Sequence, residues 1–404
     1  MSELQIAPIK NFALGIYDGP HATPMEVDEG PVFLGIKNVT PEGRLDLSEI
    51  RHVSEQEYLK WTKRVTPQKD DVVFSYEATL HRYALIPDGF HGCLGRRMAL
   101  VRPDQSKIIP RFLHYYFMSP AWRSVVEANI INGATVDRIP IKKFPDFEVS
   151  IPSISKQLSI SGILSAYDDL IENNRRRIQL LEQAVRLLYK EWFVHLRFPG
   201  HEHTQIINGV PEGWEDMFLP DVIAVNPKTP VEKGKEILYV PMSALSETGM
   251  TANTADFERR TTHTTVKFKK NDVLLARITP CLENGKTGYA YFLRDDEVAC
   301  GSTEFIVLRG RHVSSAFTYC LARSYPFRGN AIKSMIGSSG RQRVQASCFD
   351  EYRVPLPPKY LLKMFDEIAN TAFGQIRVLV AQNDKLIKAR DILLPKLMNG
   401  EMAV

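Results

Sequence analysis

The sequence predicts an α+β protein in which two α/β domains are joined by two long helices that form an antiparallel coiled coil. Residues 156–198 carry apolar side chains at alternating spacings of four and three, the heptad pattern of a helix that packs on a second helix. A matching pattern runs from about 359 to 394. The chain also repeats itself at an offset of roughly 200 residues, which indicates a pseudo-twofold internal repeat.

The first long helix is predicted from an unbroken run of seam positions. Pro152 ends the extended segment before it, and we expect Pro199-Gly200 to end the helix. A helix of some 40 residues is on the order of 60 Å long. The alternative is a long helix in the core of one globular domain. The seam positions are Ile160, Leu164, Tyr167, Ile171, Asn174, Ile178, Leu181, Val185, Leu188 and Trp192.

The second long helix supplies the partner that such a seam needs. Each seam contains one asparagine, and a buried amide can fix the register of a coiled coil. We therefore expect Asn174 and Asn383 to lie in one buried polar layer. Leu181, Trp192 and Ile376 are the other candidate coiled-coil residues. The second seam is Leu362, Phe365, Ala369, Ala372, Ile376, Leu379, Asn383 and Leu386.

The internal repeat sets the predicted domain boundaries. Short β-rich runs alternate with turns in each half, and Arg111–Val126 and Ser314–Ser324 are predicted helices. We expect a first domain at 1–153, a helix at 154–200, a second domain at 201–356 and a helix at 357–404. Four segments align in the same order: Pro31–Lys37 with Glu236–Met242, Lys69–Phe74 with Lys270–Leu275, Gly133–Ile139 with Gly337–Val344, and Ile151-Pro152 with Val354-Pro355.

Length and composition indicate a folded cytoplasmic protein. The 404 residues are too many for one simple core, and the hydrophobic content of 44% is ordinary for folded chains. No run approaches the length of apolar sequence that spans a membrane, and the first residues lack the layout of a signal peptide. The five cysteines include no C-x-x-C pair, so we expect reduced thiols and no zinc site.

Basic residues gather in corresponding parts of the two halves. Phe305–Phe349 contains seven Arg or Lys residues and no acidic residue, and Gly89–Val126 contains six against Asp104 alone. Such stretches are typical of phosphate-binding surfaces, because neutralised phosphates release counterions. The alternative is a solvated basic face without a partner.

Motifs of catalysis are missing from the sequence. No two glycines are spaced G-x-G, and the Gly285-Lys286-Thr287 triplet has Pro280 where a phosphate loop needs glycine. No acidic residue precedes a lysine by two positions, and Pro357-Pro358 follows Leu356 instead of the Asn or Asp of an amino-methyltransferase motif. We therefore expect no active site, cofactor or metal, and a protein that is not itself an enzyme.

Five segments together resemble the DNA-specificity subunit of a type I restriction-modification system. The similarity covers essentially the whole chain, and the segment around Arg277 is the most specific. The chain departs from the family pattern at Ile154–Gln157 and at Pro357–Tyr360, where the two helices are expected to begin. The five segments are Asp18–Pro24, Leu275–Lys286, Gly337–Val344, Leu188–Phe193 and Leu393–Glu401.

The resemblance implies a bipartite, asymmetric double-stranded DNA target, with one half read by each of two target recognition domains. It also implies that the coiled coil sets the gap between the halves and docks two methyltransferase subunits, through which endonuclease (translocase) subunits join. Two alternatives remain: a two-headed protein-interaction scaffold without a DNA role, and a single-chain restriction-methylation enzyme. The latter would need methyltransferase and nuclease motifs before Met1, where we expect none.

The candidate DNA-binding residues follow from the chemistry of base and phosphate recognition. Arg and Lys suit guanine, Asn and Gln suit adenine, and Thr can contact a thymine methyl group. Each of them could instead be a turn former or a surface charge, and Asn284-Gly285 in particular could simply form a turn. The candidates are His21, Thr23, Lys37, Asn38, Arg96, Arg97 and Arg138 in the first domain, and Ser243, Arg277, Asn284, Lys286, Arg341, Gln342 and Arg343 in the second.

Overall fold

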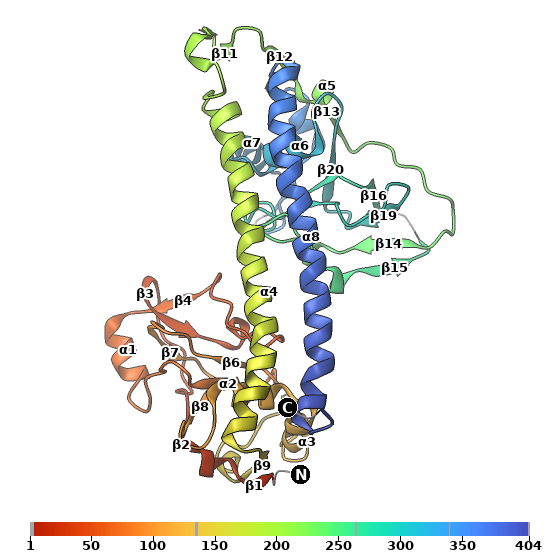
Figure 1. Cartoon of the computed structure of the whole chain (residues 1–404). Helices are drawn as coiled ribbons and strands as arrows, with labels where there is room; N and C mark the ends of the chain where they lie inside the picture. The colour runs from red at the N-terminus through yellow and green to blue at the C-terminus, as the bar shows by residue number, and fades with distance from the viewer. Residues whose placement is uncertain (1–3, 134–135, 263–264, 339, 403–404) are drawn as a thin grey trace. The chain divides into compact units, whose positions relative to one another are not determined.

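The computed structural model describes residues 4–133, 136–262, 265–338 and 340–402. They form two compact units, one of Met1–Glu172 with Asp384–Val404 and one of Asn173–Asn383. Each unit therefore contains one globular domain and a part of each long helix (Figure 1).

The long helices are α4 (Ile154–Tyr189) and α8 (Lys359–Met398). The first helix was predicted to continue to Pro199, and this prediction was wrong, because α4 ends at Tyr189. After Tyr189 the chain makes a single π-type turn (Lys190–Val194) and then turns away at Leu196, whose φ of 58° is left-handed. The second helix runs beyond its predicted end and includes Pro395, where one backbone hydrogen bond of the last turns is lost.

The two helices pair antiparallel within each unit (Figure 1). In the second unit Asn174 Nδ2 donates to Asn383 Oδ1 at 3.0 Å, and the rings of Phe193 and Phe365 lie 5.2 Å apart. In the first unit Arg390 Nη1 donates to Asp168 Oδ1 at 2.7 Å. Later positions on α4 thus meet earlier positions on α8, which confirms the antiparallel coiled coil and its asparagine layer.

The seam also completes the core of each domain. Ile160 and Leu164 are buried in the first unit together with Leu394 and Leu397. In the second unit Trp192 and Ile376 are buried in the main core, and Leu181 is partly buried against it. The predicted coiled-coil residues therefore hold the helices to the domains as well as to each other.

The domain of the first unit is built from small sheets. Its strand pairs are antiparallel except β3–β7. The expected helix at 111–126 is two helices, because Pro120 has no amide to donate and Ser119 Oγ caps the second one. The sheets are β1 (Gln5–Pro8) with β9 (Glu148–Ile151); β2 (Ala13–Asp18), β8 (Met98–Pro103), β5 (Val72–Ser75) and β6 (Tyr83–Leu85); and β4 (Arg51–Val53), β3 (Glu26–Leu34) and β7 (Gly92–Leu94). The helices are α1 (Glu55–Trp61), α2 (Pro110–Met118) and α3 (Pro120–Glu127).

The domain of the second unit has the same plan, with β14–β19 as its parallel pair. A short hairpin, β10 (Ile206–Ile207) with β11 (Val210–Pro211), precedes it. The sheets are β12 (Glu215–Phe218) with β21 (Arg353–Leu356); β13 (Ile223–Val225), β20 (Phe305–Gly310), β17 (Val273–Ala276) and β18 (Thr287–Tyr289); and β15 (Glu258–Arg260), β14 (Ile237–Val240), β19 (Val298–Gly301) and β16 (Val266–Lys269). The helices are α5 (Leu219–Val222), α6 (Ser315–Arg323) and α7 (Tyr325–Lys333).

Equivalent hydrogen bonds confirm the internal repeat and correct part of its alignment. Arg102 Nε donates to Asp71 Oδ1 at 2.9 Å, and Arg309 Nε donates to Asp272 Oδ1 at 2.7 Å, as the alignment of the two aspartates requires.

Two aligned segments are shifted. The carbonyl of Leu34 accepts from Gly95 N as that of Val240 does from Ser302 N, so Leu34 matches Val240, one position later than the sequence alignment placed it. The strand pairing of β9 and β21 likewise matches Ile151 with Leu356 instead of Val354. Short apolar runs align almost equally well at neighbouring positions, because many apolar residues are interchangeable.

Candidate nucleic-acid interface

In the first unit, the segment after β5 gathers several of the predicted DNA-binding residues. Tyr76 follows β5, its amide donates to Arg97 O at 3.1 Å, and its carbonyl accepts from Ile139 N at 2.7 Å. His21 Nδ1 lies 3.4 Å from the Tyr76 hydroxyl, and Arg97 Nε lies 3.0 Å from Glu77 Oε1. Arg138 pairs with Glu77 through a backbone bridge. His21, Arg97 and Arg138 therefore converge, although they are far apart in the sequence.

The electrostatics of this cluster favour hydrogen-bond donors. Burial, followed by the charges of Asp18 and Glu77, raises the pKa of Tyr76 to about 12, so its hydroxyl stays protonated at neutral pH. His21 Nε2 lies 3.2 Å from Asp18 Oδ2, and Arg64 Nη1 contacts the other oxygen of that carboxylate at 2.6 Å. An imidazole, a phenol and two guanidinium groups can all contact phosphate oxygens or base edges.

The other candidates of the first unit lie apart from that cluster. Thr23 and Arg96 are exposed, and Lys37 is exposed with its ammonium 3.8 Å from Glu49. The structure corrects the assignment of Asn38, which is 2% exposed. Its Oδ1 accepts from Gly35 N at 3.1 Å, and its Nδ2 donates to the carbonyls of Asp46 and Glu49. The amide is fully engaged in holding the turn after β3, because an amide suits backbone groups as well as it suits adenine.

In the second unit, Arg277 occupies the place of Tyr76. Its carbonyl accepts from Val344 N at 2.8 Å, as that of Tyr76 does from Ile139 N, and its Nη2 donates to Gln345 Oε1 at 3.2 Å. Ile278 bridges to Arg343, whose Nε lies 2.9 Å from Glu304 Oε1. The amide of Thr279 donates to the carbonyl of Gln342 at 3.0 Å. Arg277, Gln342 and Arg343 are thus brought together.

Of four further candidates in the second unit, three lie on loops and Ser243 lies in the 3-10 helix Met242–Ala244. Ser243 and Arg341 are exposed, and Lys286 is half-buried. Asn284 Nδ2 donates to Glu247 Oε1 at 3.2 Å, and the next residue, Gly285, has a φ of 87°. Asn284 therefore occupies a tight turn, although its side chain remains exposed. Ser339, within a segment that carried the family resemblance, lies outside the described residues.

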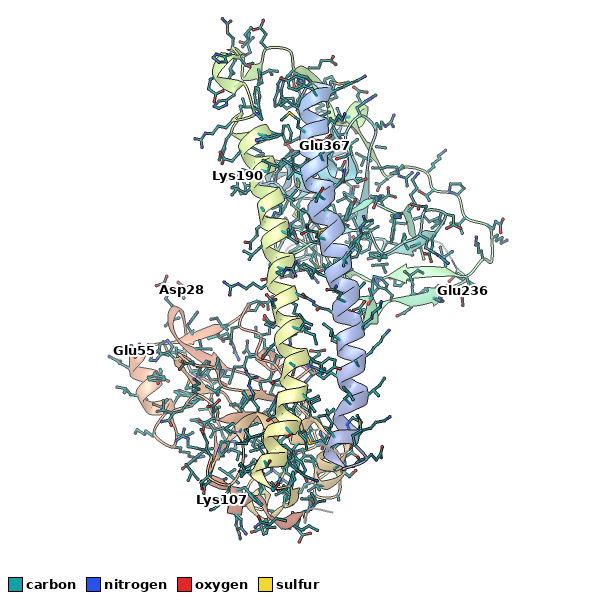
Figure 2. The ribbon with its side chains drawn as sticks, in the orientation of Figure 1. Asp28, Glu55, Lys107, Lys190, Glu236 and Glu367 are labelled. Atoms are coloured by element: carbon teal, nitrogen blue, oxygen red, sulfur yellow. The ribbon has the colours of Figure 1, made fainter. Side chains whose placement is uncertain are left out.

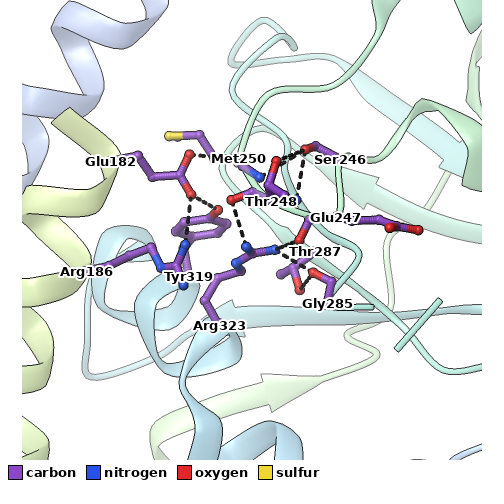
Figure 3. Close-up of polar contacts among 11 residues, drawn as sticks. Glu182, Arg186, Ser246, Glu247, Thr248, Met250, Gly285, Thr287, Tyr319 and Arg323 are labelled. Carbon is purple, nitrogen blue, oxygen red and sulfur yellow. Dashed lines mark hydrogen bonds and ion pairs between the residues drawn. The ribbon is translucent and has the colours of Figure 1, made fainter. Parts of the chain in front are cut away.

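Two buried charged side chains position these loops (Figure 3). Arg323, which is 5% exposed, donates to the carbonyls of Glu247 at 3.0 Å, Thr248 at 2.9 Å and Gly285. Glu182 of α4, which is 3% exposed, accepts from Met250 N at 2.8 Å.

The other oxygen of Glu182 accepts from the Tyr319 hydroxyl at 2.6 Å. Burial, followed by the charge of Glu182, raises the pKa of Tyr319 well above its ordinary value, so this hydroxyl remains a donor. The long helix α4 is thereby linked to the 246–250 loop and to α6, whose Arg323 in turn binds Gly285.

Several arginines of the two basic stretches already bind other groups of the protein and are therefore not available to a phosphate. Arg102 and Arg309 pair with the buried Asp71 and Asp272. Arg328 donates to Glu283 O at 2.8 Å, and its burial, followed by the charges of Arg323 and Arg186, lowers its pKa. The prediction that each entire stretch forms a phosphate surface was therefore too broad. A count of charges does not show which guanidinium groups already have partners.

Sequence reasoning missed two polar residues in the connection between β13 and β14. Asn226-Pro227-Lys228-Thr229-Pro230 occupies the place of Gly19–Pro24, the connection between β2 and β3 that contains His21 and Thr23. The signal was present in the sequence as a second proline-to-Thr-Pro segment. By position Lys228 and Thr229 belong with the candidate residues of the second unit, but Thr229 Oγ1 already accepts from Arg309 Nη2 at 3.0 Å and donates to Pro227 O at 3.3 Å.

Comparison with known proteins assigns the family. The family model described as "Type I restriction modification DNA specificity domain" matches this chain twice, at residues 37–183 and 211–363. The chain belongs to this specificity family. The two matches cover most of both domains and parts of α4 and α8, in agreement with the internal repeat.

Individual members of the specificity family are similar at low sequence identity. The type I restriction enzyme MjaIX specificity subunit of Methanocaldococcus jannaschii is 23% identical over 88% of this chain and 82% of its own length. The EcoEI specificity subunit of Escherichia coli is 32% identical, but over only 37% of this chain and 26% of that subunit. The crystal structure of a type I restriction-modification S subunit from M. genitalium matches 98% of this chain and 96% of its own, with a TM-score of 0.52 at 15% identity. That structure supports the fold.

Within the described residues, no group of three or more His, Cys, Asp or Glu side chains has an arrangement that could hold a metal ion. None of the helices in the described ranges combines the length and apolar character needed to cross a bilayer.

Proposed function

We propose that this chain is the non-catalytic DNA-recognition subunit of a type I restriction-modification complex. One observation carries the proposal: the same site is built twice, with unlike side chains. In the first domain, the site at the end of β5 presents His21, Tyr76 and Arg97. In the second domain, the site at the end of β17 presents Arg277 and Arg343. Because base edges are distinguished by the donors and acceptors that face them, unlike residues at equivalent places imply unlike half-sites. The target is therefore bipartite and asymmetric.

Residues 1–153 and 201–356 are proposed as the two target recognition domains, and 154–200 and 357–404 as the helical segments that set the gap between half-sites. The proposed partners are double-stranded DNA, two methyltransferase subunits and, through them, endonuclease (translocase) subunits. The proposed DNA contacts are His21, Thr23, Lys37, Arg96, Arg97 and Arg138 in the first domain and Ser243, Arg277, Asn284, Lys286, Arg341, Gln342 and Arg343 in the second.

Exposed apolar side chains on the helices support docking of protein subunits. Leu180 and Leu187 of α4 and Ile368 and Val378 of α8 each expose at least half of their surface. Apolar side chains that recur along a helix away from its own seam are typical of a protein contact. The scaffold alternative shares this feature but predicts no salt-dependent binding to DNA.

Alanine substitution of Arg341 and of Arg277 tests the DNA-reading proposal. Loss of a guanine contact should weaken binding to the cognate site by about 1–3 kcal/mol and relax one base position, while subunit assembly is unchanged. Arg294→Ala is the matched control, since Arg294 is an exposed arginine of the same domain near Glu297. Unchanged affinity and unchanged modification at every base would remove both residues from the interface, and a wild-type chain without sequence preference would refute the function.

A further inference from the structure

The second unit contains a cavity of about 690 Å³ beside Arg277. It is formed by the β13–β14 connection, the start of β16, and the residues before and at the start of β20. Phe305 and the prolines of the connection supply apolar walls. Its polar lining includes Lys228, Thr229, Lys267 and Arg277.

The cavity has an excess of positive charge. No acidic side chain lines it, and no ion pair is formed by Lys228, Lys267 or Arg277 within the part of the chain that the structure describes. The Nε of Arg277 is buried without a hydrogen-bond partner among those residues. A buried donor without an acceptor is unfavourable, and an anionic oxygen in the cavity would satisfy it.

A neighbouring cavity does not have this excess of positive charge. It lies at the other end of the same connection and has a volume of about 350 Å³. There Lys235, Arg259 and Arg294 are accompanied by four acidic residues, Glu232, Glu236, Asp296 and Glu297. Glu236, labelled in Figure 2, immediately precedes β14. Of these two cavities, the one beside Arg277 is therefore the one whose cations have no acidic neighbours in the lining.

The position of the cavity connects it to recognition. In the first unit the equivalent connection brings His21 to Tyr76, and Arg277 occupies the place of Tyr76. In the second unit the corresponding connection and strand end line one cavity, with cations where the first unit has an imidazole and a phenol.

We propose that this cavity binds a backbone phosphate of the DNA, with the ammonium groups of Lys228 and Lys267 as its charged donors. The inference rests on the proposed function and deepens it. Lysine ammonium groups act as point charges that suit phosphate, whereas base reading by arginine needs a planar pair of donors. Several cations around one hollow therefore indicate a phosphate contact, which fixes the position of the domain on DNA without selecting a base.

The test measures DNA affinity as a function of salt, between about 50 and 200 mM, for the full chain with its partner subunits. The Lys228→Ala/Lys267→Ala double variant should bind cognate and unrelated duplexes more weakly by the same factor. The slope of log affinity against log salt should fall by about 0.9, the value for one phosphate contact. Lys235→Ala is the control and should leave affinity and slope unchanged, because Lys235 lies in the balanced cavity.

Two results would overturn the assignment. They are an unchanged slope in the double variant and a loss confined to the cognate duplex. The loss confined to the cognate duplex would indicate base reading. A wild-type chain that prefers no sequence, but whose slope falls as expected in the double variant, would refute the proposed function while supporting the phosphate cavity.

Discussion

The carboxylate of Glu182 is predicted to hold the loops of the second domain in their binding position. Replacing it by leucine leaves two buried donors, Met250 N and the Tyr319 hydroxyl, without their acceptor. Each buried donor left unpaired costs about 1–3 kcal/mol, so Glu182→Leu should lower the free energy of unfolding by about 2–6 kcal/mol. Tyr319→Phe removes one donor from a buried carboxylate and should cost about 1.5–3 kcal/mol.

The assay combines urea denaturation of the full chain with measurement of its binding to the cognate duplex. Because Met250 ends the 246–250 loop, and Arg323 joins that loop to Gly285, Glu182→Leu should also reduce affinity at concentrations of urea where the protein stays folded. Glu182→Gln retains one acceptor and should recover part of both losses.

Glu367→Leu is the control, since Glu367 is an exposed carboxylate on the other long helix (Figure 2). A surface substitution of this kind changes stability by about 0.5 kcal/mol or less. If Glu182→Leu matched the wild type in both stability and affinity, the loops would not depend on this anchor and the reasoning would be refuted.

Two further predictions concern the helices. Asn174→Leu or Asn383→Leu alone should lower the free energy of unfolding by about 1–3 kcal/mol, because the other amide stays buried without this bond, and the double variant should recover most of the loss. If the losses of unfolding free energy in the two single variants added up in the double variant, the two asparagines would not be coupled. Deleting one heptad from each helix shortens the pair by about 10 Å, roughly three base pairs of DNA, and should change the tolerated gap accordingly. Mapping of methylated sites measures this change, and an unchanged gap would show that the helices do not set it.

The local periodicity of the sequence was sufficient to predict the coiled coil. Seam residues such as Leu164 and Ile376 are buried, and Asn174 contacts Asn383 across more than 200 residues of intervening chain. Heptad spacing records which face of a helix is buried, and each seam held a single polar residue, so the pairing of the asparagines followed from composition and order. The repeat was visible for the same reason, because equivalent strands need similar patterns.

The partners of the charged residues were decided only by the tertiary structure. Arg323 and Arg341 belong to the same basic stretch, yet Arg323 is buried against three carbonyls and Arg341 is exposed. Likewise, Arg309 of that stretch pairs with Asp272, which lies 37 residues earlier in the chain. The pattern of buried residues along a helix can be read from residues close together in the sequence. The partner of a charged side chain, in contrast, often comes from a distant part of the chain. The sequence by itself therefore determined the helical framework and the family, and the fold decided which cations remain available to DNA.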